Sequence, residues 1–274
     1  MSWPVGYLFD SSNWEWLTSG NNLRFLLEAF LVNLEIAAIA IVFSLAFGLL
    51  LALARLSKLR PLGLAAGAWV DVWRNLPLIF IILYLALAMP SSWQEAYEDV
   101  VPAFFPEALQ SGRVFAGILG LVLYNSAVIA EIMRAGILSL DRGQGEAAAS
   151  LGLTYPQQLR YVILPQGLRR MVPATVSQLI TLNKDTTLVS IIAIPEVMRA
   201  GRTLSSGFTA FVGGVQAPLL QVFIFIGLLF VVVNLTLSRL SRRLELRERK
   251  RTGGRAGPVT GIEDQTALAL EGRS

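Results

Sequence analysis

Residues 143–165 read GQGEAAASLGLTYPQQLRYVILP, and this stretch decides how the chain is interpreted. It lies between two apolar segments, but it contains too many small and polar residues to enter a bilayer. Asp141 and Thr154 are each followed three residues later by Gln, a pattern typical of helix N-termini. The sequence therefore predicts two short helices that meet at a turn near Gly152.

The composition indicates an integral membrane protein. Of 274 residues, 54% are hydrophobic and only 15% are charged, whereas soluble domains carry about a quarter charged residues. The chain contains neither Cys nor His, which excludes disulfides, thiolate nucleophiles, His-based acid–base catalysis and the usual zinc ligand sets. The formal net charge is +4, but the basic residues flank apolar segments, where membrane topology accounts for them. Nucleic-acid binding is therefore not expected.

Several apolar segments are long enough to cross a bilayer, which requires roughly 20 residues in a helix. They are residues 29–54, 62–89, 114–133, 171–194 and 217–238. The second segment is uneven, because polar residues and Pro77 precede its apolar half LIFIILYLALAM. We therefore predict an all-α, polytopic membrane protein with five transmembrane helices and a helix interruption near Pro77.

Lys and Arg residues predict the orientation of these segments, because cytoplasmic loops carry an excess of them. They are frequent after the first segment, between the third and fourth, and after the fifth. The N-terminus is therefore expected outside and the C-terminus in the cytoplasm. The chain then divides into an external N-terminal segment at 1–24, a transmembrane domain at 25–240 with a cytoplasmic loop at 135–165, and a basic, disordered cytoplasmic tail at 241–274.

Tryptophan residues gather beside the segment ends that are expected on the outer side. Trp3, Trp14 and Trp16 precede the first segment, and Trp93 follows the second. Such residues are typical of the interface between membrane and water. An equal alternative is that they pack within a small external cap.

The polar stretch also carries a spaced signature. Glu-Ala-Ala is followed by three residues and Gly, then by nine residues, Val162, one residue and Leu-Pro. Apart from Val162, which stands at an Ile position, this spacing resembles the EAA signature of ABC-importer permeases. Members of that family dock on an ATPase subunit through this loop, so the resemblance implies a coupling loop that includes Gly143, Glu146, Ala147, Ala148, Gly152, Leu164 and Pro165. The alternative, an ordinary polar loop with an alanine-rich helix, does not explain the long spacing.

The resemblance extends over about residues 25–240. Four stretches resemble motifs of the polar amino-acid uptake branch: RNLP at 74–77, YNSAVIAEIMRAG at 124–136, LPQGLR at 164–169 and KDTTLVS at 184–190. Leu76 and Gly167 replace the usual Thr and Ala. These differences affect the inference of the exact substrate and leave the resemblance to this branch unchanged. The similarity of RNLP to RNTP favours glutamate, aspartate or glutamine as the substrate.

The resemblance implies the type I ABC-importer permease fold and a set of partners. These partners are a dimer of ATPase subunits, a second identical or similar permease, an extracytoplasmic amino-acid-binding protein and the membrane lipid. No stretch reads GxxxxGK followed by Ser or Thr, so a P-loop for nucleotide phosphates is lacking. This chain is therefore expected to be a non-catalytic subunit of a prokaryotic cell membrane, without a cofactor or metal, while ATP is hydrolysed on a partner chain.

Polar side chains at membrane depth are costly, so they are expected to face protein or a water-filled path. Lys184 and Asp185 are adjacent in the fourth segment and offer one charge of each sign, as an amino-acid substrate does. An internal salt bridge between them is an equal alternative. Asn75 at the interruption and Asn125 in the third segment are further candidates for the solute path.

Two other charged positions are interpreted as structural. Glu131 and Arg134 are three residues apart on one helix face, which favours an ion pair. Glu35 lies early in the first segment, where a satisfied polar group near the outer interface is expected.

Three other classes of function compete with that of a permease. A channel or ion-coupled carrier would use the same buried charges without an ATPase, and the EAA-like loop argues against it. An intramembrane enzyme would need a nucleophile with a positioned base or a metal site, for which Cys and His are lacking. A structural scaffold would have no reason to bury Lys184 beside Asp185.

Overall fold

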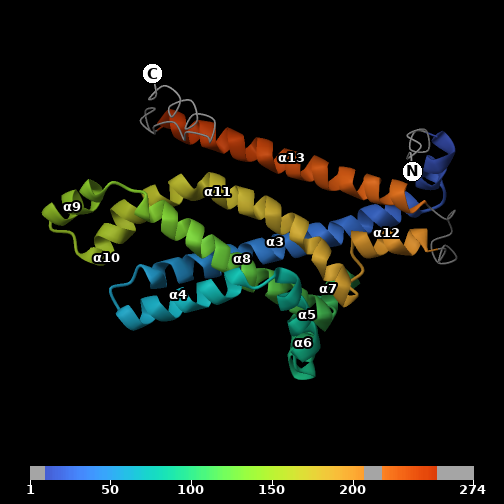
Figure 1. The fold of residues 1–274 in the computed structure, drawn as a ribbon, viewed down its shortest axis with the longest axis horizontal. Coiled ribbons are helices and arrows are strands. Elements are labelled where there is room, and N and C mark those ends of the chain that lie inside the picture. The colour runs from blue at the N-terminus through green and yellow to red at the C-terminus, as the bar shows by residue number, and fades with distance from the viewer. Residues whose placement is uncertain (1–9, 207–217, 252–274) are drawn as a thin grey trace, which may run out of the picture.

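The computed structural model describes residues 10–206 and 218–251, and every regular element within these ranges is helical. Four long helices run along the molecule (Figure 1): α3 (Asn22–Arg55), α8 (Gly112–Leu138), α11 (Leu164–Asp185) and α13 (Leu219–Arg251). The shorter elements are η1 (Ser11–Trp14), α2 (Glu15–Thr18), α4 (Arg60–Asn75), α5 (Leu78–Ala88), α6 (Ser91–Val100), α7 (Glu107–Gln110), α9 (Arg142–Ser150), α10 (Tyr155–Gln158), η2 (Leu159–Ile163), η3 (Thr186–Ile192) and α12 (Val197–Ser205). The prediction of an all-α protein is confirmed for the described residues.

The long helices have two ends that carry different elements (Figure 1). At one end, called the loop end below, lie α9, α10 and the start of α4, and the C-terminal end of α13 points in the same direction. At the opposite end, called the α12 end, lie α12 and the N-terminal helix α2. The short helices α5 and α6 project sideways from the long helices.

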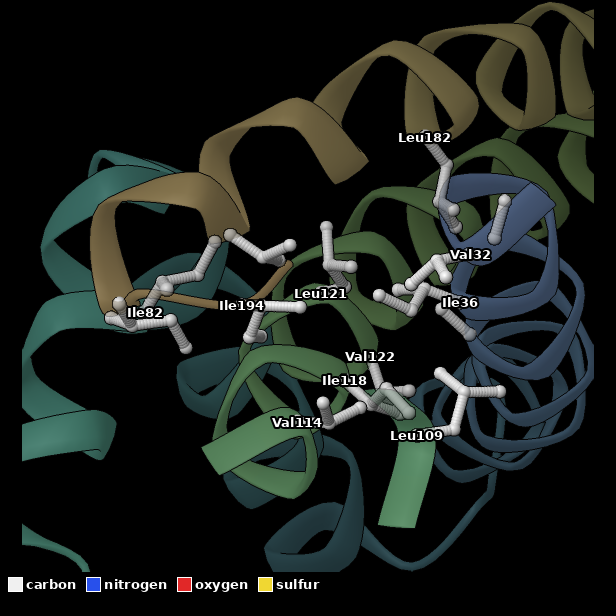
Figure 2. Close-up of a cluster of buried hydrophobic side chains, with 14 of the residues drawn as sticks. Val32, Ile36, Ile82, Leu109, Val114, Ile118, Leu121, Val122, Leu182 and Ile194 are labelled. Atoms are coloured by element: carbon white, nitrogen blue, oxygen red, sulfur yellow. The ribbon is translucent and has the colours of Figure 1, made fainter. Parts of the chain in front are cut away.

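The largest group of buried apolar side chains lies where α3, α5, α8 and α11 pack together (Figure 2). It includes Val32, Ile36, Ile82, Val114, Ile118, Leu121, Leu182 and Ile194. Between membrane helices, close packing replaces the hydrophobic effect as the main source of association, so small residues at contacts are favoured. Gly48 of α3 is such a residue, because a Cβ atom placed there would lie 2.8 Å from Ile129 Cγ2 of α8.

Three helices are long and apolar enough to cross a membrane: residues 22–55, 112–138 and 219–239. The pair α4 and α5 meets the same criterion only together, and the two helices are bent by 100° relative to each other. The first, third and fifth predicted segments therefore form long apolar helices, although α11 is too polar to be counted by this criterion. By length and composition alone, the described residues contain up to four spans.

The predicted interruption near Pro77 is confirmed. Helix α4 ends at Asn75, and α5 begins at Leu78. Because Pro77 lacks an amide hydrogen and crowds the residue before it, Leu76 adopts extended backbone angles with ψ at 138°. The Asn75 side chain donates a hydrogen bond to the Asp71 carbonyl oxygen at 2.7 Å and so closes the last turn of α4.

The fourth predicted segment, 171–194, is regular only in its first part. Helix α11 stops at Asp185, and the chain continues as the 3₁₀ helix η3 before Ala193 adopts a left-handed φ of 66°. The Thr186 and Thr187 hydroxyls donate to backbone carbonyl oxygens three residues earlier, each at 2.8 Å. Such local bonds compete with the α-helical pattern, so the prediction of one regular helix to residue 194 is corrected.

The tryptophan residues fall into both expected categories. Trp16 is only 2% exposed, and its ring packs edge-on against Phe225 of α13 at a centroid distance of 6.3 Å. It therefore belongs to a packed cap at the α12 end. Trp93 of α6 is exposed, as an interfacial residue would be, whereas Trp3 lies outside the described residues.

The first part of the predicted disordered tail is helical. Residues 241–251 of the predicted tail continue α13 as a helix to Arg251. This part of the prediction is corrected, because the run is rich in Leu, Arg, Glu and Lys, which are good helix formers. Residues 252–274 lie outside the described residues.

Candidate functional site: the loop between α8 and α11

The loop consists of two short helices, as predicted. The Asp141 side chain accepts a hydrogen bond from the Gly143 amide at 3.0 Å and starts α9. The Gln157 side chain accepts a hydrogen bond from the Thr154 amide at 2.8 Å and starts α10. Between the helices Gly152 has a φ of +78°, a left-handed conformation that Gly adopts without steric cost. The turn requires Gly at this position of the signature.

The signature residues face two directions. Glu146, Ala147 and Gly152 are exposed, whereas Ala148 is only 3% exposed and packs inward. A small side chain at Ala148 lets α9 lie against the rest of the molecule, and the exposed side offers a carboxylate beside a small residue. Leu151, at the tip, is 81% exposed. Sequence reasoning missed Leu151, although a large apolar residue directly before the turn glycine is a readable signal of a contact surface.

A π-helical turn, η2, connects α10 to α11. Within it the Leu164 amide donates to the Leu159 carbonyl oxygen, five residues back. Pro165 has no amide hydrogen and its ring crowds the backbone of the preceding turn, so the wider π turn accommodates it. Sequence reasoning placed Leu164 and Pro165 in the loop but did not predict this geometry.

Polar contacts attach the loop to the helices. The Gln166 side chain donates to Gln144 Oε1 at 3.1 Å, and Arg170 donates to the Ser139 carbonyl oxygen at 2.6 Å. Tyr155 reaches the opposite way and donates its hydroxyl to the Leu56 carbonyl oxygen at 2.8 Å. The loop is thus held both to α11 and to the end of α3.

The predicted ion pair in α8 is confirmed and has a further member. Arg134 contacts Glu131 Oε1 at 2.6 Å, and Arg55 of α3 contacts Glu131 Oε2. Glu131 therefore joins the loop ends of α3 and α8 and neutralises two guanidinium groups. Sequence reasoning could not pair Arg55 with Glu131, because the two residues are 76 positions apart.

The charged candidates for the solute path lie at the end of α11. Lys184 is exposed and Asp185 is partly buried. Among the described residues, no carboxylate oxygen forms an ion pair with the Lys184 ammonium. The alternative of a direct salt bridge between the two residues is therefore absent from this conformation.

The two amide candidates differ in environment. Asn75 is exposed at the end of α4. Asn125 is fully buried, donates to the Leu121 carbonyl oxygen at 2.9 Å and accepts a hydrogen bond from Gln178 of α11 at 2.8 Å. No hydrogen bond or ion pair joins any two of the four predicted path residues in the described part of the chain.

A buried polar network at the α12 end was missed by sequence reasoning. Asn33 of α3 donates to Glu196 Oε2 at 3.0 Å and to the Thr186 hydroxyl at 3.1 Å, and it accepts from the Val197 amide at 3.0 Å. Glu196 also accepts from the Met198 and Arg199 amides and so caps α12. An Asn inside an apolar segment was the available signal, but its partners are more than 150 positions away.

Within the described ranges the fold combines helices long and apolar enough to cross a membrane with an exposed two-helix loop. The chain belongs to the family described as "Binding-protein-dependent transport system inner membrane component", whose model matches residues 4–250. It is therefore a multi-pass protein of the bacterial inner membrane.

Alignments with individual relatives extend over most of this chain. The probable glutamine ABC transporter permease protein GlnP of Bacillus subtilis is 36% identical over 230 residues, which are 84% of this chain and 96% of that protein. The glutamate/aspartate import permease protein GltK of Escherichia coli is 31% identical over 233 residues, which are 85% and 97% of the two chains. A solved structure described as "Crystal structure of an amino acid ABC transporter with histidines" contains a chain whose sequence is 28% identical to this one. The two folds match with a TM-score of 0.66 over 82% of this chain and 94% of that chain.

Proposed function

We propose that this chain is the membrane-spanning permease subunit of an ATP-driven importer of polar amino acids. The observation that carries the proposal is the loop at 143–165, which keeps the EAA-like spacing and presents Glu146, Ala147 and Leu151 outward. The names of the relatives GlnP and GltK refer to glutamine and to glutamate with aspartate. They support the same group of substrates that RNLP favours.

The proposed topology has five spans, with α11 and η3 forming the fourth and the bent pair α4 and α5 forming the second. The N-terminus is outside and the C-terminus is in the cytoplasm. The distribution of basic residues supports this orientation, because the loop end carries Arg55, Lys58, Arg60, Arg142, Arg160, Arg169 and Arg170. The end of α13, which carries further basic residues, points in the same direction (Figure 1).

The proposed partners occupy three surfaces. ATPase subunits bind the exposed side of α9 and α10 and hydrolyse ATP, so this chain needs no nucleotide, cofactor or metal of its own. A second permease faces α11, where Ala174, Ser177 and Lys184 form an exposed stripe that is too polar for lipid. An external amino-acid-binding protein delivers the solute at the α12 end.

The proposed solute path runs along this stripe of α11. Lys184 and Asp185 would meet the carboxylate and the ammonium of the substrate, and Asn75 lies at the bend between α4 and α5. Asn125 is paired with Gln178 in this conformation, so it would contribute only after that hydrogen bond opens.

Transport by reconstituted protein tests the proposal. The permease is placed in proteoliposomes with its ATPase and binding protein, and uptake of glutamine and glutamate is measured with and without ATP. We expect uptake only when ATPase and ATP are both present. In the double variant Glu146→Lys, Gly152→Asp, the permease should insert normally but lose the ATPase during purification. Uptake without any ATPase, or full ATP-dependent uptake by the double variant, would refute the proposal.

A further inference from the structure

One contact ties the loop to a helix that does not adjoin it in sequence. The Tyr155 hydroxyl donates to the carbonyl oxygen of Leu56, the C-terminal cap residue of α3, at 2.8 Å. Carbonyl oxygens at the end of a helix have no partner within it, so this bond satisfies such a group. The Lys58 ammonium also lies 4.3 Å from the centroid of the Tyr155 ring, a favourable cation–π geometry. Tyr155 is thus held at its hydroxyl and at its ring.

A cavity lies between the loop and the helices. Its volume is about 610 Å³, and its wall includes Ile137 of α8, Glu146 of α9, Leu159 of η2, Leu56 and Tyr155. Close-packed side chains transmit a displacement directly, but side chains across a cavity do not. The Tyr155 hydrogen bond bridges loop and helix at the edge of this space.

The end of α3 stands between two polar links. The chain connects the loop directly to α8 and α11, but not to α3. Arg55 fixes the end of α3 to Glu131 of α8, and the next residue, Leu56, is bound to Tyr155 of α10. A shift of α10 relative to α8 would pull on α3 through this Tyr155 link.

The N-terminal half of α3 is also fixed to a distant element. Asn33 binds the Val197 amide at the start of α12 and the capping residue Glu196. Helix α3 has 34 residues, which corresponds to a rod of about 51 Å. A pull on Leu56 is therefore applied to a rigid element that holds α12 through Asn33, in its N-terminal half.

We propose that Tyr155 is a positioning residue for coupling, because its bond to Leu56 passes a displacement of the docked loop to α3. This inference rests on the proposed function, in which the loop docks on an ATPase. It assigns Tyr155 a role distinct from docking: without the hydroxyl, the ATPase still binds and turns over, but less of its motion reaches the membrane helices.

The test measures amino acid imported per ATP hydrolysed, a ratio that a purely structural role would leave unchanged. Tyr155→Phe removes only the hydroxyl and keeps the ring under Lys58. The matched control is Tyr161→Phe, an exposed tyrosine of the same loop. We expect the Tyr155→Phe variant to retain the ATPase through purification. Its import ratio should fall about five-fold, the factor by which the loss of one typical hydrogen bond changes an equilibrium constant. The control should keep the wild-type ratio.

A chemical rescue provides the second measurement. The chain contains no Cys, so Leu56→Cys and Tyr155→Cys introduce a unique pair. With its two thiols free, the double variant should import little amino acid per ATP hydrolysed. A short bifunctional thiol reagent that bridges the two cysteines should restore this ratio. A wild-type ratio in Tyr155→Phe, or a bridged pair that stays as poor as the unlinked one, would overturn the inference while leaving docking intact. Failure of the wild-type chain to bind its ATPase would instead refute the proposed function.

Discussion

Replacing Asn33 by Ala tests the polar network that joins α3 to α12. The change removes three hydrogen bonds, those to Glu196, Thr186 and Val197. Hydrogen bonds between membrane helices contribute about 0.6 kcal/mol on average and up to about 1.7 kcal/mol, and a charged group left with fewer partners costs more. We therefore expect the free energy of unfolding to fall by about 2–4 kcal/mol.

Thermal unfolding in detergent measures this effect. For a chain of this size, 2–4 kcal/mol corresponds to a fall in Tm of roughly 5–15 °C. The control is Asn75→Ala, because Asn75 is exposed and its side chain makes one local hydrogen bond within α4. That variant should change the free energy of unfolding by less than about 0.5 kcal/mol.

A double-mutant cycle decides whether the network causes the loss. If Asn33 acts through Glu196, the double variant Asn33→Ala, Glu196→Ala should lose clearly less free energy of unfolding than the two single variants lose together. Strictly additive effects, or equal losses in Asn33→Ala and the Asn75 control, would refute the reasoning.

Three further results are expected. Gly48→Leu should prevent α3 from packing against α8, whereas Gly227→Leu should be tolerated, because no atom lies within 4 Å of a Cβ added at Gly227. Size-exclusion chromatography distinguishes the two variants. A monodisperse Gly48→Leu protein would contradict the packing. A Cys at Glu95 should react with a membrane-impermeant reagent from outside, and a Cys at Gln157 only from inside; external labelling of Gln157 would overturn the topology. Lys184→Met should raise the substrate concentration needed for half-maximal uptake without reducing ATPase binding, and unchanged uptake kinetics would remove Lys184 from the solute path.

Local signals made the coupling loop readable from sequence. The caps at Asp141 and Thr154 and the turn at Gly152 depend on residues within a few positions of each other, so two helices and their junction could be predicted. The interruption at Pro77 has the same local character. The outward direction of Glu146 and Leu151 depends on how α9 packs, which the pattern alone does not contain.

The features that sequence reasoning missed depend on distant partners or on irregular backbone. Arg55 meets Glu131, and Asn33 meets Glu196, only because α3 packs along most of the molecule. The end of α11 departs from a regular helix through hydroxyl bonds to its own backbone, and apolar composition continues past that point. Hydropathy therefore located the segment but did not mark where its helix stops.

The π turn at Leu159–Ile163 takes up about one residue more than an α-helical turn, so the facing of the loop depends on how this one turn is closed. An α-helix turns by about 100° per residue, so closing this turn into a continuous α-helix without removing a residue would rotate everything on the loop side by about that angle about the axis of α11. Glu146 and Leu151 would then face a different side of the molecule, although every residue of the surface was unchanged. The direction in which the loop meets its partner is thus encoded in the phase of one helix as well as in the side chains that touch the partner.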